Sequence, residues 1–220
     1  MLLPDGELHL LVQFLSGDDA NALFEELLAT LAWAPHCVRV FGREHPTPRL
    51  CAWYGDAGAR YAYSGQMLEP LPWPPALARL RVRLEQALGL RFNSVLGNLY
   101  RDGADSMGWH SDDEASLGPR PAIASVSLGA TRRFLLRHRR RRELGTIELA
   151  LAHGDLLLMA GDTQRHWQHA VPKTRRPVGP RINLTFRCVA DARGRAQSSA
   201  CSTTAGVSTA GNSLGSPPGG

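Results

Sequence analysis

Residues 109–114 read Trp-His-Ser-Asp-Asp-Glu, and the rest of the chain is organised around this stretch. In an extended strand, His110 and Asp112 lie on one face, because alternate side chains point the same way. An imidazole and a carboxylate on one face can bind a single metal ion, and a second histidine would complete the facial set that suits non-haem Fe(II). Such pairs also occur by chance on protein surfaces, so the downstream sequence has to distinguish the two readings.

A strand downstream supplies the complementary chemistry. Residues 181–187 alternate without a break: Ile182, Leu184 and Phe186 face one way, and the opposite face carries two arginines and no acid. Guanidinium forks bind carboxylates in bidentate fashion. The candidate second histidine, His169, lies twelve residues before this strand. A metal beside a dicarboxylate-binding face suggests 2-oxoglutarate as co-substrate.

The order His-x-Asp, distant His, Arg-x-Asn-x-Thr-x-Arg resembles the AlkB family of Fe(II)/2-oxoglutarate-dependent dioxygenases, which repair alkylated nucleic acid. The resemblance runs from about residue 41 to residue 187 and is strongest to the branch of the human AlkB homologues 2 and 3. It rests on several ordered motifs, residues 53–58, 98–100 and 125–130 among them.

The resemblance implies a set of site residues and a reaction. Fe(II) would be held by His110, Asp112 and His169. The co-substrate 2-oxoglutarate would be bound by Asn98, Tyr100, Arg181, Asn183, Thr185 and Arg187. With O₂, such an enzyme hydroxylates an N-methyl group, which leaves as formaldehyde, and releases succinate and CO₂. His153 and His166 are rejected as the distal ligand, and His166 is expected in a loop.

Residue Phe41 lies in an expected hairpin over residues 38–50. In the duplex-acting branch of the family, an aromatic at this place inserts into the base stack when a damaged nucleotide is flipped out, which offsets part of the unstacking cost. A strand residue in a small core is the alternative for Phe41. Arg39, Arg43 and Arg49 are expected to suit phosphates.

The base pocket is expected to involve Tyr61, Tyr63 and Ser64, because a flipped base needs aromatic stacking and a few hydrogen bonds. An ordinary half-buried strand would use the two tyrosines as well. Asp113 and Glu114 add acids that a metal role alone does not need. Bases methylated at N1 of adenine or N3 of cytosine are cationic, so a pocket carboxylate would prefer them. The resemblance favours Glu114 for the base and Asp113 for fixing the loop, and an acidic surface loop is the alternative.

Patterning predicts an α+β chain with a mainly β core. Helical spacing follows the possible cap Ser16 and ends near Trp33, and a second helix opens at Pro72-Trp73-Pro74-Pro75 and ends at Gly89. Residues 53–58 look turn-like, and the basic run 138–142 is read as a solvated loop that can also follow phosphates.

The family fold is a double-stranded β-helix, or jelly roll, here with two N-terminal supporting helices. One domain is expected over residues 1–190. A disordered low-complexity tail is expected over residues 191–220, since its Ser, Gly, Ala, Thr and Pro bury little surface.

Composition limits the setting. The 220 residues carry a formal net charge of +5 with a pI near 9.4, which allows a polyanionic partner. The four scattered cysteines favour a reducing compartment, and the chain shows neither a signal peptide nor a membrane-spanning run. We therefore expect a monomer without membrane association in the cytoplasm, or in the nucleus of a eukaryote.

The sequence is interpreted as an oxidative demethylase of alkylated DNA, with RNA as a possible substrate. Two alternatives stay open. One is an AlkB-like dioxygenase that acts on RNA or protein, and the other is a nucleic-acid-binding module with a silent metal site.

Overall fold

The computed structural model describes residues 2–40, 43–59, 61–63 and 66–190. Its helices are α1 (Gly17–Thr30), α2 (Pro75–Leu88) and α3 (Thr163–His166), with short 3-10 turns η1 (Ala115–Leu117) and η2 (Arg142–Leu144). Its strands are β1 (Leu2–Leu3), β2 (Gly6–Leu11), β3 (Ala34–Val40), β4 (Arg43–Gly55), β5 (Tyr61–Tyr63), β6 (Gln66–Leu68), β7 (Ser94–Tyr100), β8 (Met107–His110), β9 (Ile123–Gly129), β10 (Arg132–His138), β11 (Thr146–Leu151), β12 (Leu156–Ala160), β13 (Trp167–Val171) and β14 (Arg181–Arg187).

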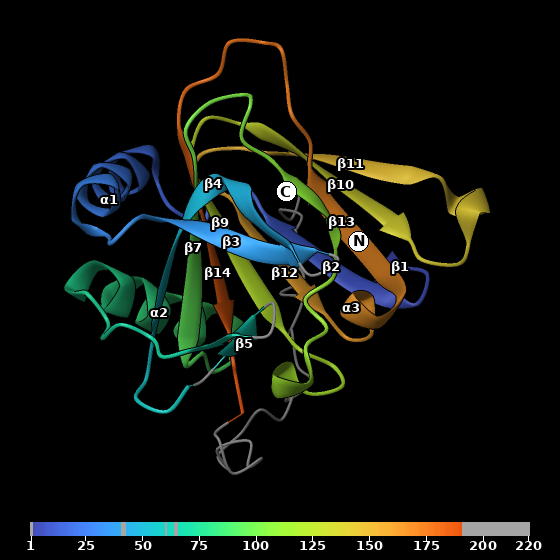
Figure 1. The fold of residues 1–220 in the computed structure, drawn as a ribbon, viewed down its shortest axis with the longest axis horizontal. Coiled ribbons are helices and arrows are strands. Elements are labelled where there is room, and N and C mark those ends of the chain that lie inside the picture. Colours follow the sequence, from blue (N-terminus) through green and yellow to red (C-terminus); the bar gives the residue numbers. More distant parts are fainter. Residues whose placement is uncertain (1, 41–42, 60, 64–65, 191–220) are drawn as a thin grey trace, which may run out of the picture.

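Two antiparallel sheets form the body of the protein (Figure 1). The major sheet has the order β1-β2-β12-β9-β14-β7-β4-β3, and the minor sheet has the order β11-β10-β13-β8. Strand β14, the last in sequence, lies between β7 and β9 in the middle of the major sheet. This arrangement confirms the expected mainly β jelly roll.

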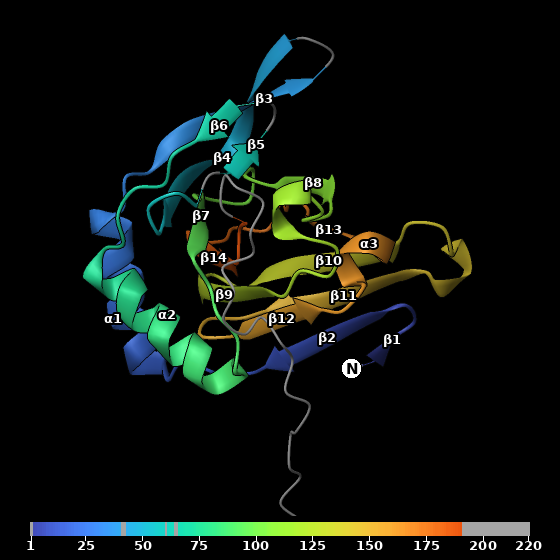
Figure 2. The same cartoon turned by 90° about the horizontal axis from the view of Figure 1, so that it is seen from below.

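The helices α1 and α2 lie against one face of the major sheet (Figure 2). Helix α1 begins after Ser16, whose Oγ accepts a hydrogen bond from the Asp19 amide at 3.2 Å. Helix α2 begins with Pro75 and ends at Gly89, which adopts a left-handed φ of 65°. Both predicted helices are therefore present, although α1 ends at Thr30 rather than near Trp33.

The major sheet separates two apolar clusters. The cluster on its helix side contains Leu27, Leu77, Leu84, Ile182, Leu184 and Phe186, all fully buried. The cluster between the two sheets contains Ile123, Leu136, Leu157 and Trp167, also fully buried. Strand β14 thus presents its apolar face to the helices and its polar face to the space between the sheets, as its alternation predicted.

Three local expectations differ from the structure. Residues 53–55 continue β4, so only the end of the 53–58 stretch turns. Gly55 is a glycine because the backbone at Asn93 passes close to it, and a Cβ at residue 55 would lie 2.8 Å from the Asn93 carbonyl oxygen. His138, expected in a solvated loop, is a buried residue that ends β10, and His166 ends α3 rather than lying in a loop.

The hairpin of β3 and β4 projects from the body of the fold (Figure 2), and its strands pair as expected for residues 38–50. Phe41 and Ser64 lie outside the described residues, as does the expected tail 191–220. Within the part of the chain that the structure describes, no helix is long and apolar enough to cross a membrane.

Candidate active site

Three predicted ligands come together between the two sheets. His110 ends β8, and His169 lies opposite it on β13 in the register of the minor sheet. Their ring centroids are 4.2 Å apart. One possible ligand atom from each of His110, Asp112 and His169 lies within 4.8 Å of the others. The sequence had suggested that His110 and Asp112 lie on one continuous strand. In the structure, Asp112 lies two residues beyond the end of β8 and reaches the cluster from the segment that follows the strand.

The protonation states of this cluster suit a divalent metal. Burial alone would raise the pKa of Asp112, but the Arg187 guanidinium and the two imidazoles outweigh it and hold that pKa below its usual value. Burial lowers the pKa of His110, and it lowers the pKa of His169 to about 3. At neutral pH the site therefore offers one carboxylate and two neutral imidazoles, the forms that bind metal.

The hydrogen bonds of the imidazoles agree with this interpretation. His110 Nδ1 lies 2.9 Å from the Gly108 carbonyl oxygen, so it carries the ring proton and leaves Nε2 free to bind a metal. His169 Nδ1 is buried and has no hydrogen-bond partner within the described residues. Two imidazoles and one carboxylate are the donor set that fits Fe(II) with positions left open for other ligands.

The cavity beside these ligands is lined by the predicted co-substrate residues Asn98, Tyr100, Asn183, Thr185 and Arg187. Arg181, the remaining predicted co-substrate residue, is not among the lining residues, and its guanidinium carbon lies 5.3 Å from the ring centroid of Tyr100, which does line the cavity. Arg181 is 1% exposed and donates one hydrogen bond to Ser127 Oγ. Its Nε and Nη1 are buried without a partner among the described residues. Donors of this kind fit the carboxylate of 2-oxoglutarate.

One cavity neighbour was assigned wrongly from the sequence. Arg49, expected to suit phosphates, is 2% exposed and therefore lies inside the fold. Its Nε donates to Asn98 Oδ1 at 2.6 Å, so it orients an amide that lines the cavity. A local pattern could not have revealed this, because Asn98 belongs to the neighbouring strand β7.

The two acids after Asp112 occupy different environments. Glu114 lines the cavity that also contains the metal ligands. Asp113 accepts a hydrogen bond from Arg139 at 2.6 Å, in an ion pair whose two side chains are both more than a third exposed. The predicted roles, with Glu114 toward a base and Asp113 fixing the loop, stay predictions. Tyr61 and Tyr63 lie in β5, which pairs with β6 as a strand.

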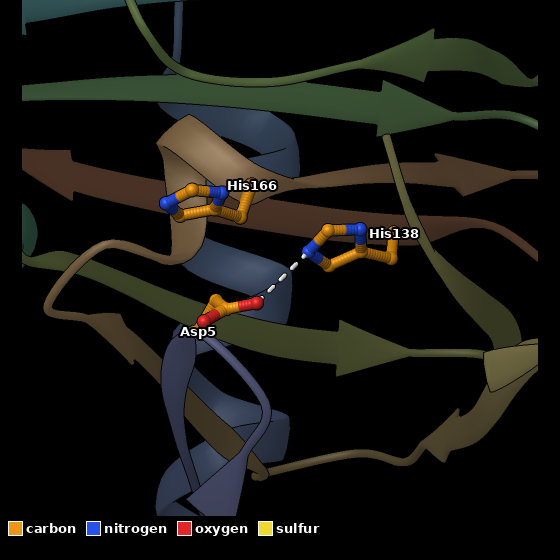
Figure 3. Close-up of side chains that lie close together, drawn as sticks. All are labelled: Asp5, His138 and His166. Atoms are coloured by element: carbon orange, nitrogen blue, oxygen red, sulfur yellow. Dashed lines mark ion pairs between the residues drawn. The ribbon is translucent and has the colours of Figure 1, made fainter. Parts of the chain in front are cut away.

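A second group of potential ligands lies near the start of the chain (Figure 3): Asp5, His138 and His166. Nδ1 of His138 accepts hydrogen bonds from the amides of Arg140 and Arg141 at 3.2 and 2.8 Å, so the ring proton is on Nε2. Nε2 lies 3.4 Å from Asp5 Oδ2. A histidine ligand binds through a lone pair and keeps its proton on the other nitrogen. The arrangement therefore fits a polar contact that fastens the turn between β1 and β2 better than it fits a metal site.

Comparison with known proteins identifies the class. The model of the 2OG-Fe(II) oxygenase superfamily matches residues 7–187. The DNA oxidative demethylase ALKBH2 of Mus musculus is 46% identical over 178 residues, covering 77% of this chain and 74% of the relative. The Homo sapiens ALKBH2 is 44% identical over 178 residues, with 77% and 68% covered.

The chain is also similar to relatives that are named alkB homolog 3. The alpha-ketoglutarate-dependent dioxygenase alkB homolog 3 of Homo sapiens is 43% identical over 184 residues, covering 80% of this chain and 64% of the relative. Among solved structures, OsALKBH1 superposes with a TM-score of 0.62 at 19% identity, covering 85% of this chain and 99% of that one, which supports the fold.

The chain therefore belongs to the 2OG-Fe(II) oxygenase superfamily, and within it to the AlkB family. The resemblance noted from the sequence is confirmed. As a member, the protein is a dioxygenase that uses Fe(II), 2-oxoglutarate and O₂.

Proposed function

We propose that the protein is an oxidative demethylase that removes N-methyl groups from bases in DNA. Curated relatives named DNA oxidative demethylase support the reaction. The structural observation that carries the proposal is that one cavity is lined by the predicted ligands His110, Asp112 and His169, by part of the polar face of β14 and by Glu114.

Each part of the cavity has a distinct task. His110, Asp112 and His169 would hold the Fe(II). Arg181 would bind the distal carboxylate of 2-oxoglutarate, and Arg187 would orient the keto acid end beside Asp112. A bound Fe(II) would supply the chemistry by which O₂ oxidises 2-oxoglutarate to succinate and CO₂ and hydroxylates the methyl group, which then leaves as formaldehyde.

Selection of the base is assigned to Glu114. A base methylated at N1 of adenine or N3 of cytosine carries a positive charge, and a carboxylate in a cavity attracts it more strongly than a neutral base. Tyr61, Tyr63 and Ser64 are proposed to complete the base pocket, and Phe41 is proposed as the wedge that replaces the flipped base in a duplex.

The polynucleotide itself is proposed to follow the basic run after β10. Arg140 and Arg142 are exposed there, and Arg139 is paired with Asp113 beside the cavity. Phosphate contacts of this kind give affinity that falls as the salt concentration rises. With such a substrate, the protein is proposed to act in the cytoplasm, or in the nucleus of a eukaryote.

The test is a repair assay on single- and double-stranded DNA that carries 1-methyladenine or 3-methylcytosine, with matched RNA as competitor. Loss of the methyl group by mass that requires both Fe(II) and 2-oxoglutarate is expected, and His110→Ala should abolish it. Succinate formation without demethylation of DNA would move the substrate to RNA or protein. If neither succinate nor demethylated DNA forms, the remaining alternative is a nucleic-acid-binding module with a silent metal site.

Glu114→Gln tests base selection separately. This variant should lose most of its kcat/KM for the cationic 3-methylcytosine and much less for the neutral 3-methylthymine, because only the cation benefits from the carboxylate. An equal loss on both bases would contradict a charge-based role for Glu114.

A further inference from the structure

A buried amide outside the ligand set contacts two of the three ligands. Gln164 lies in α3, and its side chain is 1% exposed. Its Oε1 accepts a hydrogen bond from the backbone amide of Asp112 at 2.9 Å and lies 3.3 Å from Nε2 of His169. A single oxygen atom therefore joins a ligand that follows β8 to a ligand on β13.

The orientation of this amide is well determined. The Nε2 of Gln164 faces Met159 Sδ at 3.5 Å, which is a weak acceptor. If the amide were turned over, its NH₂ group would face the N–H of Asp112, and two donors would oppose each other. The oxygen must therefore face the ligands.

The anchor of Gln164 is equally firm. Its neighbour Thr163 is 1% exposed, and the Thr163 hydroxyl accepts a hydrogen bond from the Glu7 amide at 2.9 Å. That hydroxyl also lies 2.6 Å from the Ala160 carbonyl oxygen. Beside the contact between Asp112 and Gln164, Ser111 Oγ donates a hydrogen bond to the carbonyl oxygen of Trp167, directly after α3, at 2.8 Å. Helix α3 is thus fixed to strand β2 on one side and to the ligand segment on the other.

We propose that Gln164 is a positioning residue of the metal site, which holds Asp112 and His169 in place before the metal binds. Asp112 lies beyond the end of β8, and its buried amide receives its acceptor from Gln164. The same oxygen limits rotation of the His169 ring, whose Nδ1 has no partner within the described residues. Groups that orient ligands in this way typically account for about 10- to 100-fold in metal affinity.

The test measures Co(II) binding to the full chain without co-substrate or nucleic acid, through the visible absorption bands of the bound metal. Gln164→Met keeps the length of the side chain but replaces the amide oxygen by a thioether sulfur, which is only a weak acceptor. We expect its Co(II) affinity to fall about 10- to 100-fold, with a changed absorption spectrum. Gln168→Met is the matched control, because Gln168 faces outward to Arg137, and it should bind Co(II) like the wild type.

The outcomes are separable. Wild-type affinity and spectrum in a folded Gln164→Met protein would overturn the inference. Should that variant fail to fold, Gln164→Glu decides, because it retains an acceptor oxygen: binding close to wild type supports the inference, and loss of binding in the folded protein contradicts it. The inference rests on the metal site of the proposed function. Failure of the wild type to bind Co(II) would count against that site itself, whatever the variants do.

Discussion

The guanidinium of Arg187 and the carboxylate of Asp112 form a buried ion pair, with 2.7 Å between Nη2 and Oδ1 and both side chains 4% exposed. The carboxylate proposed to bind the metal is therefore balanced by the charge of a residue proposed to bind the co-substrate. A buried pair of this kind adds little net stability, but loss of one partner leaves an uncompensated charge.

Arg187→Met should lower the free energy of unfolding of the metal-free protein by roughly 3–5 kcal/mol for that reason. Saturating Mn(II) should restore part of the loss, because the divalent cation replaces the missing positive charge. Urea unfolding with and without Mn(II) measures both effects. An unchanged midpoint in metal-free buffer would show that Asp112 does not depend on Arg187.

The metal-free protein should become less stable as the pH falls below about 6.5, the ordinary pKa of histidine. In the folded state, burial lowers the pKa of His169 to about 3 and also lowers that of His110. Between these values the unfolded chain binds more protons, so the free energy of unfolding falls with falling pH by about 1.4 kcal/mol per pH unit and proton.

Urea unfolding at a series of pH values checks this dependence, and His169→Leu provides the comparison. The variant lacks one of the shifted imidazoles, so its stability should change less steeply between about pH 6.5 and about pH 5. The lowered pKa of Asp112 acts only at lower pH, since the stability it contributes is lost as the pH falls from the ordinary pKa of aspartate through the lowered value. Equal slopes for variant and wild type would argue against a neutral, buried His169.

Arg181→Met should separate co-substrate binding from stability. The buried Arg181 side chain donates one hydrogen bond to Ser127 but has two nitrogens without a partner among the described residues, so its removal should cost the protein little stability in the absence of co-substrate. The KM for 2-oxoglutarate should rise by roughly 100-fold or more, because hydrogen bonds to a charged group contribute about 1.5–3 kcal/mol each. Steady-state kinetics and thermal unfolding give the two values. A strong loss of stability at unchanged KM would make Arg181 a structural residue.

Gly129→Ala should destabilise the protein beyond the ordinary cost of a left-handed residue. Gly129 has a φ of +84°, and an added Cβ would meet the Pro180 carbonyl oxygen and the ring of Phe24. Gly145→Ala is the control, because Gly145 has a φ of +67° with open space around its Cβ. Chemical denaturation should show about 1–2 kcal/mol for the control and about 1–3 kcal/mol more for Gly129→Ala. Equal losses would show that the neighbours yield without cost.

Much of the site could be predicted because its residues follow local rules. The alternation of β14 indicated which face of the strand is polar. The spacing of His110 and Asp112 indicated that their side chains lie close together, which the clustering of their possible ligand atoms confirms, although Asp112 lies beyond the end of β8. The sequence did not predict the burial of Arg49, Gln164 and His138, because strands or helices distant in sequence cover each of them. The turn-like reading of residues 53–58 failed because Gly55 is required by a neighbouring strand and not by a turn.

The central place of β14 has a consequence for how the chain is made. Strands β7 and β9 each pair with β14, so the major sheet keeps a gap in its middle until residue 187 is available. During synthesis both neighbouring strands wait with open edges, which is the state most exposed to association with other chains. A premature stop ahead of β14 would therefore leave an aggregation-prone chain with two unpaired strand edges rather than a weakened enzyme.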